Sequence, residues 1–100
     1  MMVTVEEGVY LQLKKMAEEK KISIASIIRQ ILVSYFKIED NTKNYSKTKI
    51  ANRRDLYGDK AYYRILVKIE RQNEVYIRNE LKKQGKTVNE LLKEMFLVTV

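Results

Sequence analysis

The order of apolar and polar positions at the start of the chain recurs near its end, 64 residues later. Under this shift apolar residues fall on apolar residues and hydroxyls on hydroxyls, without a gap. The matched segments are Val3–Glu6 with Val67–Glu70, Ser23–Ile24 with Thr87–Val88, Ile27–Arg29 with Leu91–Lys93, and Ile31–Val33 with Met95–Leu97. Self-similarity at a fixed offset indicates repeated structural units. We therefore predict two copies of one unit, residues 1–36 and 62–100, joined by a linker of residues 37–61.

Each copy opens with the alternation that is typical of a strand, because a period of two places neighbouring side chains on opposite faces. In the second copy the aliphatic residues Ile65, Val67 and Ile69 alternate with Arg64, Leu66 and Lys68. In the first copy Met1, Val3 and Val5 alternate with Met2 and Thr4. A strand this short is not stable alone, so we expect each strand to pair with another.

A helix is predicted after each strand. In the first copy the apolar stripe at helical spacing is made of Val9, Leu13, Met16 and Ala17. The matching helix is less clearly marked, since Asn73 and Glu80 stand where Val9 and Met16 stood. Gly85 is well placed to end this helix, because glycine readily adopts the left-handed conformation found at helix C-termini. Lys21 suits the matching place less well.

The last helix of each copy is the most clearly marked element. Ser23 and Thr87 are both placed to be N-caps. The apolar residues that follow them are Ile24, Ile27, Ile28, Ile31, Leu32 and Tyr35, and then Val88, Leu91, Leu92, Met95 and Phe96. This face is too broad for one short helix hairpin to cover. We predict that it forms a core with a second face of the same kind.

The linker of residues 37–61 is polar and basic, with seven Lys or Arg residues against four acids. Gly58-Asp59 is a turn signal within it. We expect it to connect the two units and to contain at most a short helix around Ile50 to Leu56.

Composition removes several classes of function. The chain has no Cys and no His, so it lacks the thiolate and imidazole groups that most metal sites use. Its carboxylates are scattered over helix faces and it has no Gly-rich phosphate loop, so we expect neither an enzyme nor a cofactor. No apolar run approaches the roughly 18 residues of a membrane helix, and no secretory signal is evident, so we expect an intracellular protein without a membrane partner.

The net charge is +7 and the isoelectric point is near 9.6. A basic balance of this size favours an anionic partner, and nucleic acid is the commonest one for a small intracellular protein. The alternative is that the charge serves solubility alone.

The sequence of strand, helix, hydroxyl cap and strongly apolar helix resembles the ribbon-helix-helix family of Arc- and MetJ-type repressors. The resemblance implies a mainly α fold with a short β-ribbon: two units in tandem, whose strands form an antiparallel two-stranded ribbon over a four-helix core. In that family the ribbon enters the major groove of double-stranded DNA. The tandem form is similar to transcription regulators encoded by viruses of hyperthermophilic archaea.

The resemblance assigns base reading to the outward side chains of the strands. These are Arg64, Leu66 and Lys68 in the second copy, and Met2 and Thr4 in the first. Arg and Lys donate to guanine O6 and N7, and Leu66 is able to contact a thymine methyl group. We expect an asymmetric site, with one half read by charge and the other by Met2 and Thr4. The alternative is a solvated basic face that protects a sheet edge.

The resemblance assigns phosphate binding to the start of each last helix, where free N–H groups and the helix dipole attract an anion. The matching residues are Ser23, Ile24, Thr87 and Val88, with Lys86 beside them. In the linker Lys47, Lys49, Arg53 and Arg54 are candidates for contacts to the DNA backbone, or form a solvated charged loop. Glu6 and Glu70 would repel phosphate unless they point at a helix N-terminus.

The length of the linker allows the two units of one chain to pair with each other, which we expect. Pairing with units of another chain, as a homodimer or a larger assembly on DNA, is the alternative. A transcription regulator, and specifically a repressor that occupies a promoter, is the leading hypothesis. An antitoxin and a protein-interaction module that never binds DNA are the competing ones, and the outer ribbon face discriminates them.

Overall fold

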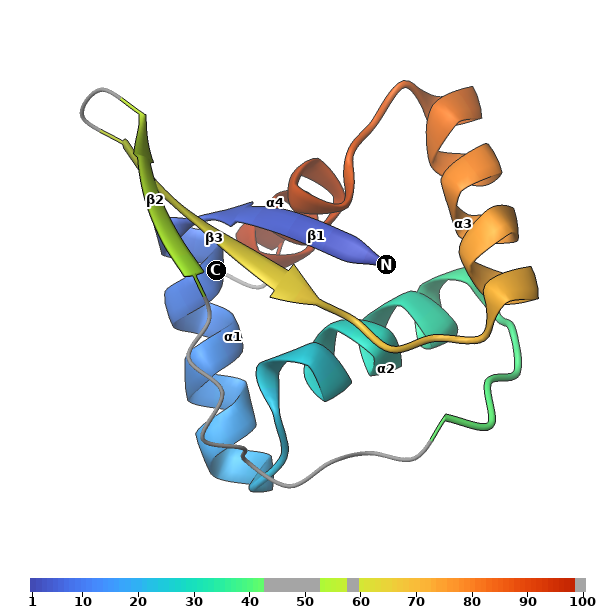
Figure 1. Cartoon of the computed structure of the whole chain (residues 1–100), viewed down its shortest axis with the longest axis horizontal. Coiled ribbons are helices and arrows are strands. Elements are labelled where there is room, and N and C mark those ends of the chain that lie inside the picture. The colour runs from blue at the N-terminus through green and yellow to red at the C-terminus, as the bar shows by residue number, and fades with distance from the viewer. Residues whose placement is uncertain (43–52, 58–59, 99–100) are drawn as a thin grey trace.

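The computed structural model describes residues 1–42, 53–57 and 60–98, with the backbone alone described for residues 53–57, 60, 97 and 98. Strand, helix and helix follow one another twice along the chain (Figure 1). The elements are β1 (Met2–Glu6), α1 (Glu7–Lys20), α2 (Ile24–Phe36), β2 (Arg53–Tyr57), β3 (Lys60–Leu66), α3 (Arg71–Gln84) and α4 (Val88–Val98). The expected mainly helical fold with a short ribbon is confirmed.

The ribbon consists of β1 and β3, which pair antiparallel with Met2 opposite Leu66 and Thr4 opposite Arg64. The backbones of Met1 and Val67 extend the ladder by two hydrogen bonds, of 2.8 and 2.9 Å. The alternation up to Ile69 predicted that Lys68 lies within the strand. In the structure β3 ends at Leu66, and Lys68 lies two residues beyond it.

A third strand, β2, joins the sheet on the other side of β3, so that the order among the described residues is β1-β3-β2. This corrects the expectation of a short helix around Ile50 to Leu56, because Arg53–Tyr57 is a strand. The physical reason is that the outer edge of β3 offers backbone groups that need partners, and β2 supplies them. The dipeptide Gly58-Asp59 between the two strands is a hairpin signal that the sequence did contain.

Both units fill one core. The inward side chains Val3, Val5, Ile65 and Val67 of the ribbon are buried against the helices. The helical residues of the same cluster are Val9, Leu13, Ala17, Ile27, Ile28, Leu32, Ile77, Leu81, Leu91 and Leu92. Helices α1, α2 and α4 contact the sheet, and α3 stands at the side of the molecule (Figure 1). The two units of the chain thus pair with each other in this structure.

The helix ends follow the predicted capping. The Ser23 hydroxyl accepts a hydrogen bond from the Ser26 N–H, and the Thr87 hydroxyl accepts one from the Glu90 N–H, each over 3.1 Å. Gly85 ends α3 with a φ of 65°, in the left-handed region where a residue without a Cβ is favoured. Lys21 ends α1 in the same conformation, although it is less suited to it.

Asn73, which broke the predicted apolar stripe, is buried and connects α3 to the start of the linker. Its amide donates to the Glu39 carbonyl over 2.7 Å and to Asp40 Oδ2 over 2.9 Å. Asp40 Oδ2 also accepts from the Glu70 N–H at the start of α3, over 2.9 Å. Partial burial opposes ionisation of Asp40, but hydrogen bonds from Thr42, Asn73 and Glu70 outweigh it and lower its pKa to about 2. Asp40 is therefore a helix cap supplied by the linker.

None of the helices in the described part of the chain combines the length and apolarity that crossing a bilayer requires.

Candidate nucleic-acid interface

The outward face of the ribbon brings together four of the five residues predicted to read bases. Met2 and Thr4 of β1 and Leu66 of β3 are exposed on this face, and Arg64 is half-buried on it. Lys68 is exposed just beyond the strand, and its carbonyl accepts a hydrogen bond from Arg29 Nη1 over 3.2 Å. The side chain of Arg29 is buried, so it fixes the backbone at Lys68 from inside the fold.

The register shows which outward residues of the two strands face each other. Thr4 of β1 lies directly opposite Arg64 of β3, and Met2 lies opposite Leu66. Arg64 of β3 and Lys68 beyond it supply the positive charge, whereas Met2 and Thr4 of β1 are uncharged. The two cations Arg64 and Lys68 lie on either side of the Met2–Leu66 pair.

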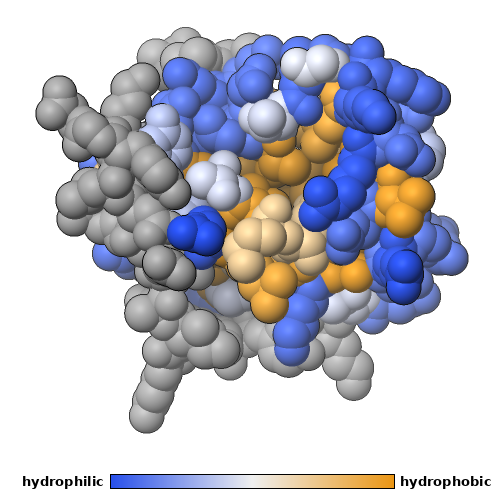
Figure 2. All heavy atoms as spheres, turned by 45° about the horizontal axis from the view of Figure 1, so that its top comes forward, coloured by the Kyte–Doolittle hydropathy of each residue, from blue (hydrophilic) through white to orange (hydrophobic). Residues whose placement is uncertain are grey.

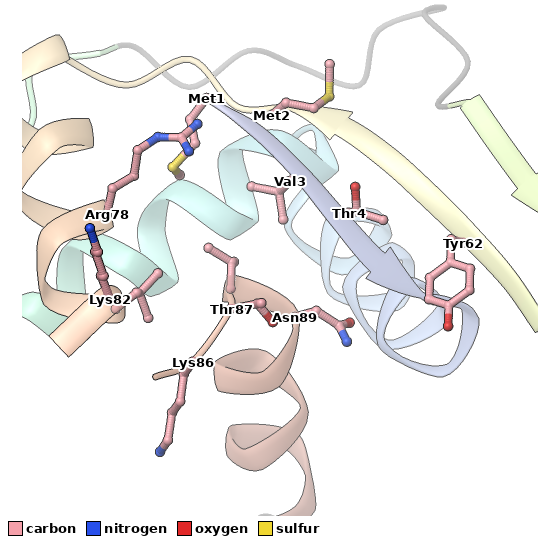
Figure 3. A pocket seen from close by; sticks show the side chains of 12 residues that line it. Met1, Met2, Val3, Thr4, Tyr62, Arg78, Lys82, Lys86, Thr87 and Asn89 are labelled. Atoms are coloured by element: carbon pink, nitrogen blue, oxygen red, sulfur yellow. The ribbon is translucent and has the colours of Figure 1, made fainter. Parts of the chain in front are cut away.

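Tyr62 also lies on this face, opposite Glu6, and was missed by the sequence interpretation. Its side chain is half-buried and lines a groove beside the ribbon (Figure 3). The signal that would have found it is the same alternation, continued two residues back from Arg64.

A groove of about 490 Å³ separates β1 from the end of α3 and the start of α4. Its apolar lining consists of Met1, Met2, Val3, Leu81 and Val88, and its polar lining of Thr4, Tyr62, Arg78, Lys82, Lys86, Thr87 and Asn89. Figure 2 shows apolar surface gathered in a hollow with hydrophilic residues around it. Figure 3 shows Arg78, Lys82 and Lys86 along the side of the groove formed by α3 and the turn into α4. One predicted phosphate-binding set, Lys86, Thr87 and Val88, therefore lies beside β1.

Two of these cations have acidic neighbours. Lys86 Nζ lies 2.8 Å from Glu94 Oε2, and this hydrogen bond raises the pKa of Lys86. Arg78 Nε lies 3.0 Å from Glu74 Oε2. Hydrogen bonds from the Met1 amine and from Arg78 hold the pKa of Glu74 below its usual value.

The other predicted phosphate-binding set, Ser23 and Ile24, is half-buried at the start of α2. The positions equivalent to Arg78, Lys82 and Lys86 under the 64-residue offset are Lys14, Glu18 and Ile22. Lys20 and Lys21 in turn precede Ser23 where the second unit has Gln84 and Gly85. The two helix starts therefore differ in where their charges stand, although a hydroxyl caps both.

Glu6 and Glu70 are both engaged in hydrogen bonds. The Glu6 N–H donates to Asn89 Oδ1 over 2.9 Å, and its carboxylate accepts from Asn89 Nδ2 over 3.2 Å and lies 3.4 Å from Lys93 Nζ. Glu6 is thus directed to the first turns of α4. The Glu70 carboxylate accepts from the Asn41 N–H over 2.6 Å.

Of the linker candidates, Arg53 and Arg54 lie in β2, where Arg53 is opposite Arg64 in the register. Lys47 and Lys49 lie outside the described residues.

No protein-family model matches the chain. Protein ORF100b of Acidianus filamentous virus 2 (isolate Italy/Pozzuoli) is 51% identical over 100 residues, which are 100% of both chains. Protein 28 of Sulfolobus islandicus filamentous virus (isolate Iceland/Hveragerdi) is 42% identical over 99% of this chain and 98% of its own length. The chain belongs to the family of these filamentous-virus proteins.

A solved structure of similar shape is that of AvtR, described as a novel transcriptional regulator from a hyperthermophilic archaeal lipothrixvirus. The two agree with a TM-score of 0.89 and 47% sequence identity, over 98% of this chain and 99% of AvtR. The expected ribbon-helix-helix fold and the expected kinship with proteins of viruses of hyperthermophilic archaea are thereby confirmed.

Proposed function

We propose that this protein is a transcription regulator that binds double-stranded DNA sequence-specifically and places the β1–β3 ribbon in the major groove. The observation that carries the proposal is the outward face of the ribbon, where Arg64 and Thr4 lie next to an exposed apolar pair and Lys68 follows just beyond the strand. The likeness to AvtR, a transcriptional regulator at 47% identity, supports the same function. The major groove of B-DNA is about 12 Å wide and admits a two-stranded ribbon.

In this proposal Arg64 and Lys68 donate to guanine O6 and N7, and Thr4 and Tyr62 contact neighbouring bases. Arg64 is suited to a bidentate contact, because its guanidinium presents two parallel N–H donors. The half-buried position of Arg64 between Thr4 and β2 restricts its side chain, which favours one register on the bases.

Phosphate contacts would fix the position of the ribbon in the groove. We assign them to the starts of α2 and α4, through Ser23, Ile24, Thr87 and Val88, with Lys86 supplying charge. The Glu6 carboxylate lies at the first turns of α4, where Lys93 offsets its negative charge. Arg53 and Arg54 of β2 would follow the DNA backbone, because a third strand is too wide for the groove itself.

The protein would act inside the host cell, as a repressor that occupies a promoter. Residues 1–36 and 62–100 would form the two DNA-facing units, and residues 37–61 the connection between them. Further copies would assemble along the DNA.

The test is selection of bound sequences from a pool of random duplexes, followed by affinity measurements on the selected site. We expect enrichment of a defined sequence, with binding that weakens steeply as salt concentration rises. Failure to enrich any sequence would contradict the proposed function.

The variant Arg64→Ala is expected to lose about 1–3 kcal/mol of discrimination at one base pair, because one bidentate contact disappears. Arg71→Ala is the matched control, since it removes the same charge at the start of α3, outside the ribbon. Base-by-base affinity profiles of both variants measure the effect. Equal profiles for Arg64→Ala and the parent protein would contradict the assignment of Arg64.

A further inference from the structure

The centre of the ribbon face is an exposed apolar pair. Met2 and Leu66 lie directly opposite each other, and 54% and 59% of their surfaces are exposed. In Figure 3 the Met2 side chain points to the opposite side of β1 from the buried Val3. Neither side chain carries a hydrogen-bond donor.

The pair also marks the approximate two-fold axis of the molecule. The 64-residue offset that relates the two units takes position 2 to position 66, and these are the two residues that face each other. The next outward pairs are not related in this way, since Thr4 faces Arg64 and Glu6 faces Tyr62. An antiparallel ribbon in the major groove aligns its two-fold axis with that of the duplex. Met2 and Leu66 would then face the central bases of the site, one on each DNA strand.

The chemistry of the groove identifies the group that suits such a pair. Thymine presents a C5-methyl group beside its O4 acceptor in the major groove, whereas guanine, adenine and cytosine present hydrogen-bonding atoms and no methyl group. A guanine or cytosine edge pressed against Leu66 would lose water without gaining a partner, which is unfavourable. A thymine methyl group in the same place removes apolar surface of both molecules from water.

We propose that the Met2–Leu66 pair reads thymine methyl groups at the centre of the recognised site, one from each DNA strand. This inference rests on the proposed function and adds the base identity at the centre. A second copy of the chain is a poorer occupant of this apolar centre, because it would bring its own Arg64 and Lys68 against those of the first.

The test uses the full-length protein and the duplex obtained by selection. Each central thymine is replaced by deoxyuridine, which removes the methyl group and keeps base pairing. We expect about a fourfold loss of affinity per central methyl group, the factor that corresponds to burial of one methylene-sized group. Replacement of thymines outside the contacted site is the matched control and should leave affinity unchanged.

Variants of the pair connect the effect to the residues. In Leu66→Ala and Met2→Gln the preference for thymine over deoxyuridine at the faced position should disappear, while Leu66→Met should keep it. Both residues are exposed, so these changes leave the core intact. A selected site whose centre lacks thymine, or equal affinity for the thymine and deoxyuridine duplexes, would overturn the inference and leave the proposed function standing. A protein that enriches no sequence at all would instead overturn the proposed function.

Discussion

The two units of the chain are alike inside and different outside. Equivalent core positions hold residues of one kind, such as Ile28 and Leu92, which are both fully buried. At the surface near the last helix the first unit has Lys14, Glu18 and Ile22 where the second has Arg78, Lys82 and Lys86. Both units fill one shared core, which restricts both in the same way. The surface of each unit is not restricted by this core, so the two units can carry different charged residues there.

The largest expected effect tests whether equivalent positions of the two units contribute equally to the shared core. Leu92→Ala and Ile28→Ala should each lower the free energy of unfolding by about 3 kcal/mol, because each leaves a cavity in the shared core. Denaturant titration measures both. Since one core serves both units, each variant should still unfold in a single transition. Two separate transitions would indicate that the units fold independently.

A smaller effect tests the difference in charge. The double change Lys82→Ala and Lys86→Ala should weaken DNA binding by about tenfold for each phosphate interaction that it removes, and should flatten the dependence of binding on salt. The control is Lys14→Ala with Lys20→Ala, which removes the same charge from the first unit and should weaken binding less. Fluorescence anisotropy at several salt concentrations provides both values. Equal effects of the two double changes would mean that the two units contribute equally to phosphate binding.

The smallest effect tests the linker cap of α3. Asp40→Ala should lower the free energy of unfolding by about 1 kcal/mol at neutral pH, because the start of α3 loses its cap. Folding lowers the pKa of Asp40 from 3.8 to about 2, so its contribution is present above about pH 4 and is lost as the pH falls toward 2. Unfolding curves of both proteins between pH 7 and pH 2 measure this. A constant difference over that range would exclude the ionised carboxylate as the cause.

The predictable parts of this molecule are those that depend on neighbouring residues. The helical stripes, the caps at Ser23 and Thr87 and the left-handed Gly85 follow from local spacing and local hydrogen bonds. The outward alternation placed Met2, Thr4, Arg64 and Leu66 on one face for the same reason.

The parts that escaped prediction depend on residues far away in the chain. Strand β2 has no alternating apolar pattern and forms where the edge of β3 needs hydrogen-bonding partners. Asn73 is acceptable in a buried position because Glu39 and Asp40 come from the linker to meet it. The pairing of Thr4 with Arg64 depends on the register of two strands about sixty residues apart, which neither strand encodes alone.

The shared core affects how the occupancy of a DNA site would depend on the concentration of this protein in the cell. A ribbon made from two separate chains is complete only where those chains meet, so its formation depends on their concentration. Here β1 and β3 belong to one chain, and the ribbon is complete in every folded molecule. Occupancy of a single DNA site would then rise with the first power of protein concentration. Even at a low protein concentration, site occupancy would be proportional to that concentration.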